Sequence, residues 1–363
     1  DPYGDDWIIQ PVNGYGTPEM IRSTLRFEKP DAIWIMTDPR FWGWLWEIED
    51  EIRSLVPLIY YHVWDNYPLP TYNKANYNSN DVIACISKLT HQVVKGVAPN
   101  VESHYLPHAV DSKIFCKRPD EEVAQLKSSS FGDDINDKFI VFWNNRNARR
   151  KQSGSLIFWF KKFLDIVGHD NACLIMHTDV YDPNGQDLNE IIKSLGLVNG
   201  EVKFSTAKIP PEHLSLIYNM ADCTINVSDA EGFGLATLES LSCETPIIVT
   251  MTGGLQEQVT DGSKSFGVGI QPASKAIIGS QEIPFIYEDR VSEEGVVDAL
   301  LTLYSMPKEE RNELGRLGRE HVEKNYNFSD FNKKWVELVD NTLEKHGSWE
   351  TRKNYKSYDC LEV

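Results

Sequence analysis

Two acidic residues flank a glycine-containing stretch whose spacing suits the binding of a polyhydroxyl ligand. Glu231 and Glu239 are separated by seven residues in the stretch EGFGLATLE. Leucines recur at helical spacing after the glycines, so a helix is predicted to begin near Glu231 and to place Glu239 two turns further along roughly the same face. Carboxylates accept hydrogen bonds from hydroxyl groups, and free amides at a helix N-terminus bind anions. The stretch therefore predicts one edge of a ligand-binding crevice.

A second group of candidate residues is basic and follows another predicted strand. The stretch NNRNARRK holds Arg146, Arg149, Arg150 and Lys151 in a chain with a net charge of −18. Cations at the carboxyl end of a parallel strand, followed by a helix N-terminus, suit a phosphate or diphosphate. A solvated basic turn is the alternative interpretation. Both groups follow strands of one predicted domain, at the edge where doubly wound sheets bind ligands, and this shared position favours binding.

Three further features give weaker signals. His62 ends a predicted strand in YYHVWD, where it could act as an acid or base or bind a sugar hydroxyl, although a hydrogen-bonded structural histidine is the commoner case. The glycines of TGGLQEQ let the backbone approach a ligand closely, and Glu257 follows them. Six of the ten tryptophans fall in the first 65 residues. Tryptophan can stack on sugars, but the helical spacing of Trp42 and Trp46 predicts core positions.

Length, charge and composition exclude several classes of protein. A chain of 363 residues is expected to form two domains, and its acidic balance argues against nucleic-acid binding and strong attraction to anionic lipid. No apolar run approaches the roughly 18 residues of a transmembrane segment, and the first residues lack a signal-peptide pattern, so a cytoplasmic location is predicted. The six cysteines are scattered without a CxxC pair, which favours reduced thiols over disulfides or zinc ligands.

Strands and helices are predicted to alternate in two series, which indicates parallel sheets built from βαβ units. In the first series the predicted strands are 32–36, 58–63, 81–86 and 101–106, and the helices are 19–27, 41–55 and 88–97. A polar connection is expected over 107–137. In the second series the strands are 139–143, 172–177, 202–205, 223–227 and 247–250, and the helices are 155–167, 188–195, 211–220 and 235–243. A strand at 284–287, helices at 293–305, 308–325 and 329–345, and a loose tail complete the prediction.

These motifs together resemble the signature of the retaining GT-B glycosyltransferases, a family that includes sucrose-synthase-like enzymes and bacterial mannosyl- and glucosyltransferases. EGFGLATLE resembles the paired-glutamate motif, and Arg146 and Lys151 match an upstream Arg and Lys. TGGLQEQVTDG resembles the Gly-Gly turn after the motif. LPHAVD resembles the interdomain PNGVD segment, with His108 in place of the usual Asn. The resemblance covers roughly 81–326.

The resemblance implies an α/β protein of two facing Rossmann-like domains. Residues 1–110 would form the N-terminal, acceptor-side domain, and 111–325 the C-terminal domain that binds a nucleotide-sugar. Residues 326–363 would supply a helix that packs back on the N-terminal domain, and then the tail. The N-terminal domain is expected to be small or truncated for the family, because the predicted linker is reached after only about 106 residues. The segment Asn13–Gly16 is a poor match to the family's Gly-rich loop, since no strand clearly precedes it.

The resemblance also implies roles for individual residues. Arg146 and Lys151 would neutralise the donor diphosphate, Glu231 would hold the sugar hydroxyls, Glu239 would bind the ribose, and His62 would approach the reacting sugar. Glu231, His62, Arg146 and Lys151 are the implied catalytic residues. The implied donor-binding set adds loop amides and comprises Arg146, Lys151, Glu231, Gly232, Phe233, Gly234, Leu235 and Glu239.

The implied activity is that of a retaining hexosyltransferase in polysaccharide or glycoconjugate biosynthesis. Its donor would be a nucleotide-diphosphate sugar of the UDP or GDP type, its acceptor a hydroxyl of a carbohydrate, lipid or protein, and it would need no metal or cofactor. A nucleotide-sugar epimerase, a glycosyl phosphorylase and a non-catalytic nucleotide-sugar-binding module remain alternatives on the same fold. The motifs do not specify the sugar, the base, the acceptor or the oligomeric state.

Overall fold

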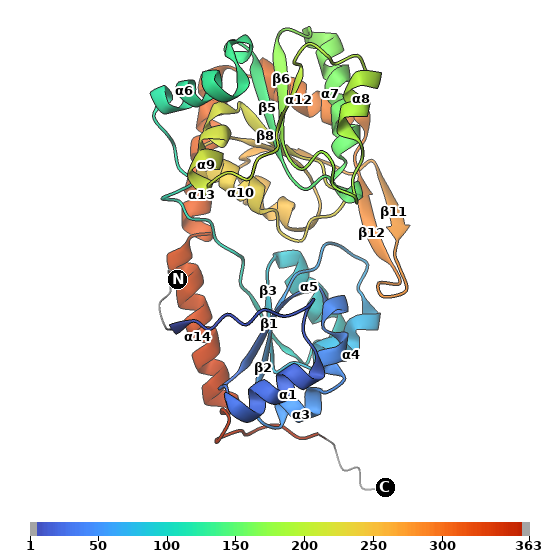
Figure 1. Ribbon diagram of the computed structural model, residues 1–363, viewed down its shortest axis with the longest axis vertical. Coiled ribbons are helices and arrows are strands. Elements are labelled where there is room, and N and C mark those ends of the chain that lie inside the picture. The colour runs from blue at the N-terminus through green and yellow to red at the C-terminus, as the bar shows by residue number, and fades with distance from the viewer. Residues whose placement is uncertain (1–5, 358–363) are drawn as a thin grey trace.

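The first of the two parallel sheets has four strands and lies near the N-terminus. The computed structural model describes residues 6–357, which form two α/β domains placed end to end (Figure 1). The sheet has the order β1-β2-β3-β4, with the bounds Ile33–Thr37, Leu58–His62, Val82–Cys85 and Glu102–Tyr105. The main helices around it are α1 (Pro18–Phe27), α3 (Glu49–Arg53), α4 (Lys74–Asn78) and α5 (Lys88–Val97). Every residue of β2 and β3 is buried, as expected for central strands covered on both faces.

The second sheet is parallel and has six strands in the order β10-β9-β8-β5-β6-β7. Its strands are β5 (Phe139–Asn144), β6 (Ala172–His177), β7 (Val202–Ser205), β8 (Cys223–Asn226), β9 (Ile247–Thr250) and β10 (Gly267–Ile270). Its helices are α6 (Asp120–Phe131), α7 (Ser153–Val167), α8 (Leu188–Ser194), α9 (Pro211–Met220), α10 (Leu235–Ser242), α11 (Gln256–Val259), α12 (Glu293–Ser305) and α13 (Lys308–Asn325). The chain order reverses between β5 and β8. Ligands bind at such a switch point in doubly wound sheets.

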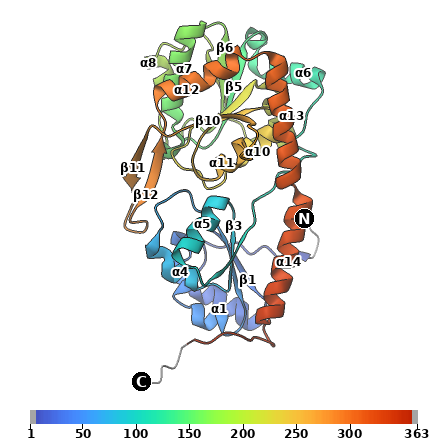
Figure 2. The same ribbon diagram turned by 180° about the vertical axis from the view of Figure 1, so that it is seen from behind.

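The chain crosses between the domains twice, and the two crossings lie side by side. The Val110 amide donates to the Tyr326 carbonyl over 2.9 Å, and Val110 forms a parallel bridge with Asn327. After the second crossing, α14 (Phe328–His346) runs along the N-terminal domain (Figure 2). There the Trp335 ring packs against the rings of Trp34 and Tyr61, with centroid distances of 5.8 and 5.0 Å.

A two-stranded antiparallel hairpin connects the domains on the opposite side of the molecule (Figures 1 and 2). It comprises β11 (Ser274–Ile278) and β12 (Ile286–Arg290). The Tyr287 amide donates to the Tyr67 carbonyl over 2.7 Å, and the Tyr72 hydroxyl donates to the Phe285 carbonyl over 2.8 Å. The domains are thus joined at both sides of their interface.

The predicted α/β class with parallel sheets is confirmed, and several elements differ from the prediction. The short helices α4 and α11 were not predicted. The helix predicted over 41–55 is divided into a short 3-10 turn, α2 (Gly43–Trp46) and α3, because Ile48 has the non-helical dihedrals φ −115° and ψ 23°. The connection over 107–137 contains α6, whose exposed and polar sequence lacks an apolar stripe. The strand predicted at 284–287 is the second strand of the hairpin, and its partner β11 was not predicted.

The described part of the tail that was predicted to be loose, residues 347–357, contacts the N-terminal domain. The Arg352 guanidinium donates to the Asp81 carboxylate over 2.8 Å and to the Arg53 carbonyl over 2.6 Å, and both acceptors belong to the N-terminal domain. Cys360 lies outside the described residues, and the other five cysteines are unpaired. Within residues 6–357, no helix combines the length and the apolar character that crossing a membrane requires.

Candidate functional site

The two candidate groups meet at the switch point of the six-stranded sheet. The basic stretch follows β5, and the glycine-containing loop follows the neighbouring strand β8. The Lys151 ammonium donates to the Glu231 carboxylate, and each residue is only 8% exposed. Burial by itself raises the pKa of Glu231, but Lys151 and Arg150 outweigh this effect and hold the pKa below its ordinary value. A buried carboxylate–ammonium pair therefore marks the carboxyl edge of the sheet.

The loop between β8 and α10 is held in shape by the Gly-Gly turn behind it. The Gly254 amide donates to the Glu231 carbonyl over 2.9 Å, and a Cβ atom on Gly253 would lie 1.8 Å from that same oxygen. Gly234 has a φ of +93° and precedes the first residue of α10, a conformation that favours glycine. The helix begins at Leu235, the first residue of the predicted helix, so Glu231 lies in the loop before it.

Glu239 lies on α10 and is linked to the end of β5 by a chain of hydrogen bonds. The Tyr218 hydroxyl donates a hydrogen bond to the Glu239 carboxylate over 2.7 Å, and the side-chain amide of Asn144 donates to that hydroxyl over 2.8 Å. Burial raises the pKa of Glu239. Tyr218 and Asn144 were not predicted as site residues. The position of Asn144 as the first residue of the stretch NNRNARRK was the one available signal.

The basic residues separate into different surroundings. Arg146 is exposed and pairs with Asp182 rather than with Glu231, with Nε–Oδ2 and Nη2–Oδ1 distances of 2.5 and 3.1 Å. Arg150 lies closer to Glu231. Its Nη1 donates to the Ala230 carbonyl over 2.6 Å and lies 3.9 Å from Glu231 Oε2.

The N-terminal domain approaches this site through the loop after β2. A Cβ atom on Gly232 would lie 2.6 Å from Val63 Cγ1 and 2.9 Å from Asp65 Oδ1. Asp65 Oδ2 in turn lies 3.9 Å from Arg150 Nε. Contact between the domains is therefore direct at the glycine-containing loop, and Asp65 faces the site although the sequence analysis gave it no role.

His62 does not reach this surface. Its side chain is fully buried inside the N-terminal domain, and its Nε2 lies 2.9 Å from the Tyr77 hydroxyl. Burial lowers the pKa of His62 to about 3, so the ring is neutral at neutral pH. The expected approach of His62 to a bound sugar is not met in this conformation, because the ring packs between Tyr60, Trp64 and Tyr77.

Glu257, a weak candidate in the sequence, joins the two domains beside the site. Its carboxylate accepts from the Lys88 amide over 2.9 Å and from the Tyr105 hydroxyl over 3.0 Å. Burial raises its pKa. A second set of interdomain hydrogen bonds lies at the hairpin. There the side-chain amide of Asn66 and the Thr252 hydroxyl donate to the Asp289 carboxylate over 2.7 and 2.8 Å.

Comparison with known proteins adds a family match and many structural likenesses. The model of the family described as glycosyl transferases group 1 matches residues 135–321. N-acetyl-alpha-D-glucosaminyl L-malate synthase of Bacillus anthracis is 26% identical over 192 residues, which are 52% of this chain and 46% of that protein. D-inositol 3-phosphate glycosyltransferase of Geodermatophilus obscurus is 33% identical over 115 residues, 28% of this chain and 26% of that one. The matched regions span less than half the length of these relatives.

Two solved structures resemble nearly the whole chain. Sucrose-phosphate synthase from Thermosynechococcus elongatus aligns with a TM-score of 0.70 at 17% identity, covering 90% of this chain and 77% of that one. Anabaena HepE, solved in complex with UDP and glucose, aligns with a TM-score of 0.67 at 13% identity, covering 91% and 84%. These likenesses confirm the predicted GT-B fold of two facing Rossmann-like domains.

Proposed function

The chain belongs to the group 1 glycosyl transferases, and from this premise we propose that it transfers a hexosyl group from a nucleotide-diphosphate sugar to an acceptor hydroxyl with retention of configuration. The observation that carries the proposal is the buried Lys151–Glu231 pair, which lies between β5 and the glycine-containing loop before α10. This arrangement puts a cation for phosphate and an acceptor for sugar hydroxyls at the sheet edge that binds ligands.

Each part of the donor has a counterpart among the residues at this edge. Lys151, with the N-terminus of α10, would bind the diphosphate, and Arg146 would join them by leaving Asp182. Glu231 would accept hydrogen bonds from the sugar, and Glu239 from the ribose. The cations and helix N-terminus offset the charge that develops on the leaving diphosphate, so the proposed reaction needs no metal ion.

Retention would follow from attack on the same face of the sugar. The bond from the anomeric carbon to the diphosphate oxygen breaks, the acceptor oxygen bonds to that carbon from the same side, and its proton passes to the departing diphosphate. No protein carboxylate then acts as a nucleophile, which distinguishes this reaction from the two-carboxylate scheme of glycosidases. UDP or GDP is the expected carrier, and HepE is a structural neighbour solved with UDP.

The proposal is tested by mass-spectrometric assay of sugar transfer after thermal-shift screening with UDP, GDP and ADP has identified the carrier. Arg146→Ala, Lys151→Ala and Glu239→Ala should each lower kcat/KM by the equivalent of about 1.5–3 kcal/mol, the value of one charge-assisted contact. Lys161→Ala is the control, because Lys161 pairs with Asp165 on a surface helix. Undiminished transfer in all three variants would overturn the assignment.

Product analysis with and without acceptor separates the alternatives. An epimerase converts the donor sugar without any acceptor, and a phosphorylase releases a sugar phosphate when inorganic phosphate is added. A binding module shows calorimetric binding of nucleotide but no turnover against a broad acceptor panel.

A further inference from the structure

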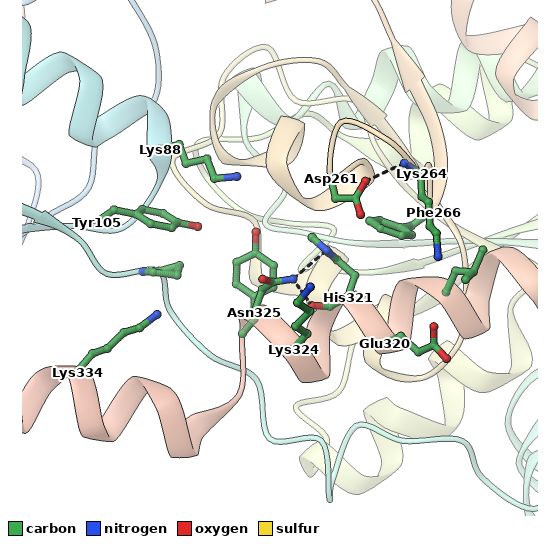
Figure 3. Close-up of a pocket in the computed structure, with 13 residues that line it drawn as sticks. Lys88, Tyr105, Asp261, Lys264, Phe266, Glu320, His321, Lys324, Asn325 and Lys334 are labelled. Atoms are coloured by element: carbon green, nitrogen blue, oxygen red, sulfur yellow. Dashed lines mark hydrogen bonds between the residues drawn. The ribbon is translucent and has the colours of Figure 1, made fainter.

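A basic cavity lies between the two domains beside their crossing segments and outside the proposed donor site (Figure 3). Its volume is about 580 Å³. Four lysines line it from four separate segments: Lys88 at the start of α5, Lys264 in the loop before β10, Lys324 near the end of α13, and Lys334 on α14. The N-terminal domain, the C-terminal domain and the returning helix thus each supply at least one cation.

Within residues 6–357, none of the four ammonium groups forms a side-chain hydrogen bond or an ion pair. Glu257 and Glu313 attract Lys88 and Lys264 only at longer range. The two acidic residues of the cavity have partners elsewhere. Asp261 accepts from the Ser263 and Lys264 amides over 2.8 and 2.7 Å, and Glu320 pairs with Arg316. Like charges gathered in one concave space repel one another, so an anion from solution would be favourable there.

The inner wall of the cavity is held by hydrogen bonds that do not involve the lysine side chains. His321 Nε2 lies 3.0 Å from the Glu257 carbonyl, and the Tyr326 hydroxyl donates to that carbonyl over 3.2 Å. Asn325 Nδ2 lies 3.1 Å from His321 Nδ1. Burial lowers the pKa of His321, so the ring supports the wall as a neutral group.

We propose that this cavity binds a small polyanion that carries at least two phosphate groups. The lysine ammonium is a point charge that binds phosphate without a fixed orientation, and four of them suit a ligand with several phosphate oxygens. Because the lysines come from both domains, a ligand that contacts lysines of both domains stabilises their present arrangement. If the proposed transferase function holds, the cavity is a regulatory site, and occupancy shifts the balance between open and closed domains.

The binding test is calorimetric titration of the full chain with inorganic tripolyphosphate at low and physiological salt. The double variant Lys264→Gln/Lys324→Gln should weaken binding at this cavity by about tenfold or more, since it removes two charge-assisted contacts. Lys208→Gln/Lys333→Gln is the matched control, because it removes the same charge from two exposed positions outside the cavity. The affinity of this control for tripolyphosphate should stay within about twofold of the affinity of the unmodified chain. All affinities should fall as the salt concentration rises.

Tripolyphosphate can also enter the donor site, so Lys151→Gln is titrated in parallel. Loss of a binding event in the Lys264/Lys324 variant but not in Lys151→Gln supports the cavity. Unchanged binding in the Lys264/Lys324 variant, equal loss in the control, or loss in Lys151→Gln alone overturns it. These results do not depend on sugar transfer, which the Arg146, Lys151 and Glu239 variants test separately. All substituted lysines other than Lys151 are exposed, so these variants should fold normally.

Discussion

At the scale of single residues, the site depends on charges held where water has little access. A buried ammonium or carboxylate alone would be costly, and breaking such a pair leaves the remaining charge without compensation. Lys151 and Glu231 offset one another in this way, and Arg150 lies within 3.9 Å of the same carboxylate. A phosphate placed beside Lys151 would therefore find a cation that is already desolvated and oriented.

Asp229 gives a prediction on the pH dependence of stability. Burial raises its pKa to about 6, whereas an unfolded chain ionises near about 3.9. Between these values the folded protein holds a proton that the unfolded chain has lost, so stability falls as pH rises from about 4 to about 6. Asp229→Asn removes this pH-dependent loss of stability, and the asparagine can still accept a hydrogen bond from the Gln152 side chain. Thermal melts should show a higher Tm for the variant at pH 7 and a difference near zero at pH 4.

The control for this prediction is Asp170→Asn, which changes an exposed carboxylate. It should shift Tm little at any pH. A difference between Asp229→Asn and the unmodified chain that stays constant from pH 4 to 8 would contradict the assigned cause.

Local spacing predicted part of the residue set and missed the rest for a physical reason. Glu231, Glu239 and Lys151 belong to compact motifs, and the structure places them at the expected edge of the sheet. Arg150 and Asp65 face the site through a contact between segments 85 residues apart, which no local pattern encodes. His62 is buried because neighbouring aromatic rings enclose it, and a strand-end position in the sequence does not reveal such rings.

At the scale of elements, Gly232 in the loop between β8 and α10 allows the two domains to approach each other closely at the site. Gly232→Ala should disfavour the closed arrangement, because its Cβ would meet Val63 and Asp65. Small-angle X-ray scattering should report a larger radius of gyration. Val63→Ala in the same chain should partly reverse the change, since it removes the nearer of the two contacts.

Gly43→Ala is the matched control, because a Cβ at Gly43 meets nothing within 4 Å. An unchanged radius of gyration in Gly232→Ala would show that the loop tolerates the methyl group by a local shift.

Elements with strong periodicity were predicted most closely. Helix α5, helix α9 and strand β6 have the predicted bounds. Helix α5 has an apolar face and a serine cap, helix α9 begins with a proline, and strand β6 is a continuous apolar run. Helix α6 was missed because its polar sequence supplies no periodic apolar face, and it is held by packing against α9. Strand β11 has only partly buried and exposed residues, so its sequence gives no strong strand signal.

At the scale of the whole molecule, the C-terminal segment fastens the returning chain to the N-terminal domain. Arg352 and Arg53 both bind the buried Asp81 carboxylate. Arg352→Ala should lower the free energy of unfolding by about 1.5–3 kcal/mol, because it removes a charge-assisted contact from a buried partner. Thermal or denaturant unfolding measures this loss.

Lys353→Ala is the comparison for Arg352→Ala, because Lys353 is exposed and its recorded hydrogen bonds use its backbone. It should have little effect. Equal loss in both variants would show that the segment acts through its general position rather than through the Asp81 contact.

The paired crossings near Val110 and Tyr326 also have a mechanical consequence. Two adjacent chain segments joined by a hydrogen bond form a hinge, and this hinge restricts the domains to rotation about a single axis. The β11–β12 hairpin lies on the far side of the molecule from that axis (Figures 1 and 2). A small rotation therefore moves the hairpin contacts with Tyr67 and Tyr72 over the longest arc. We therefore expect the contacts between the hairpin and the N-terminal domain to break first when the domains open.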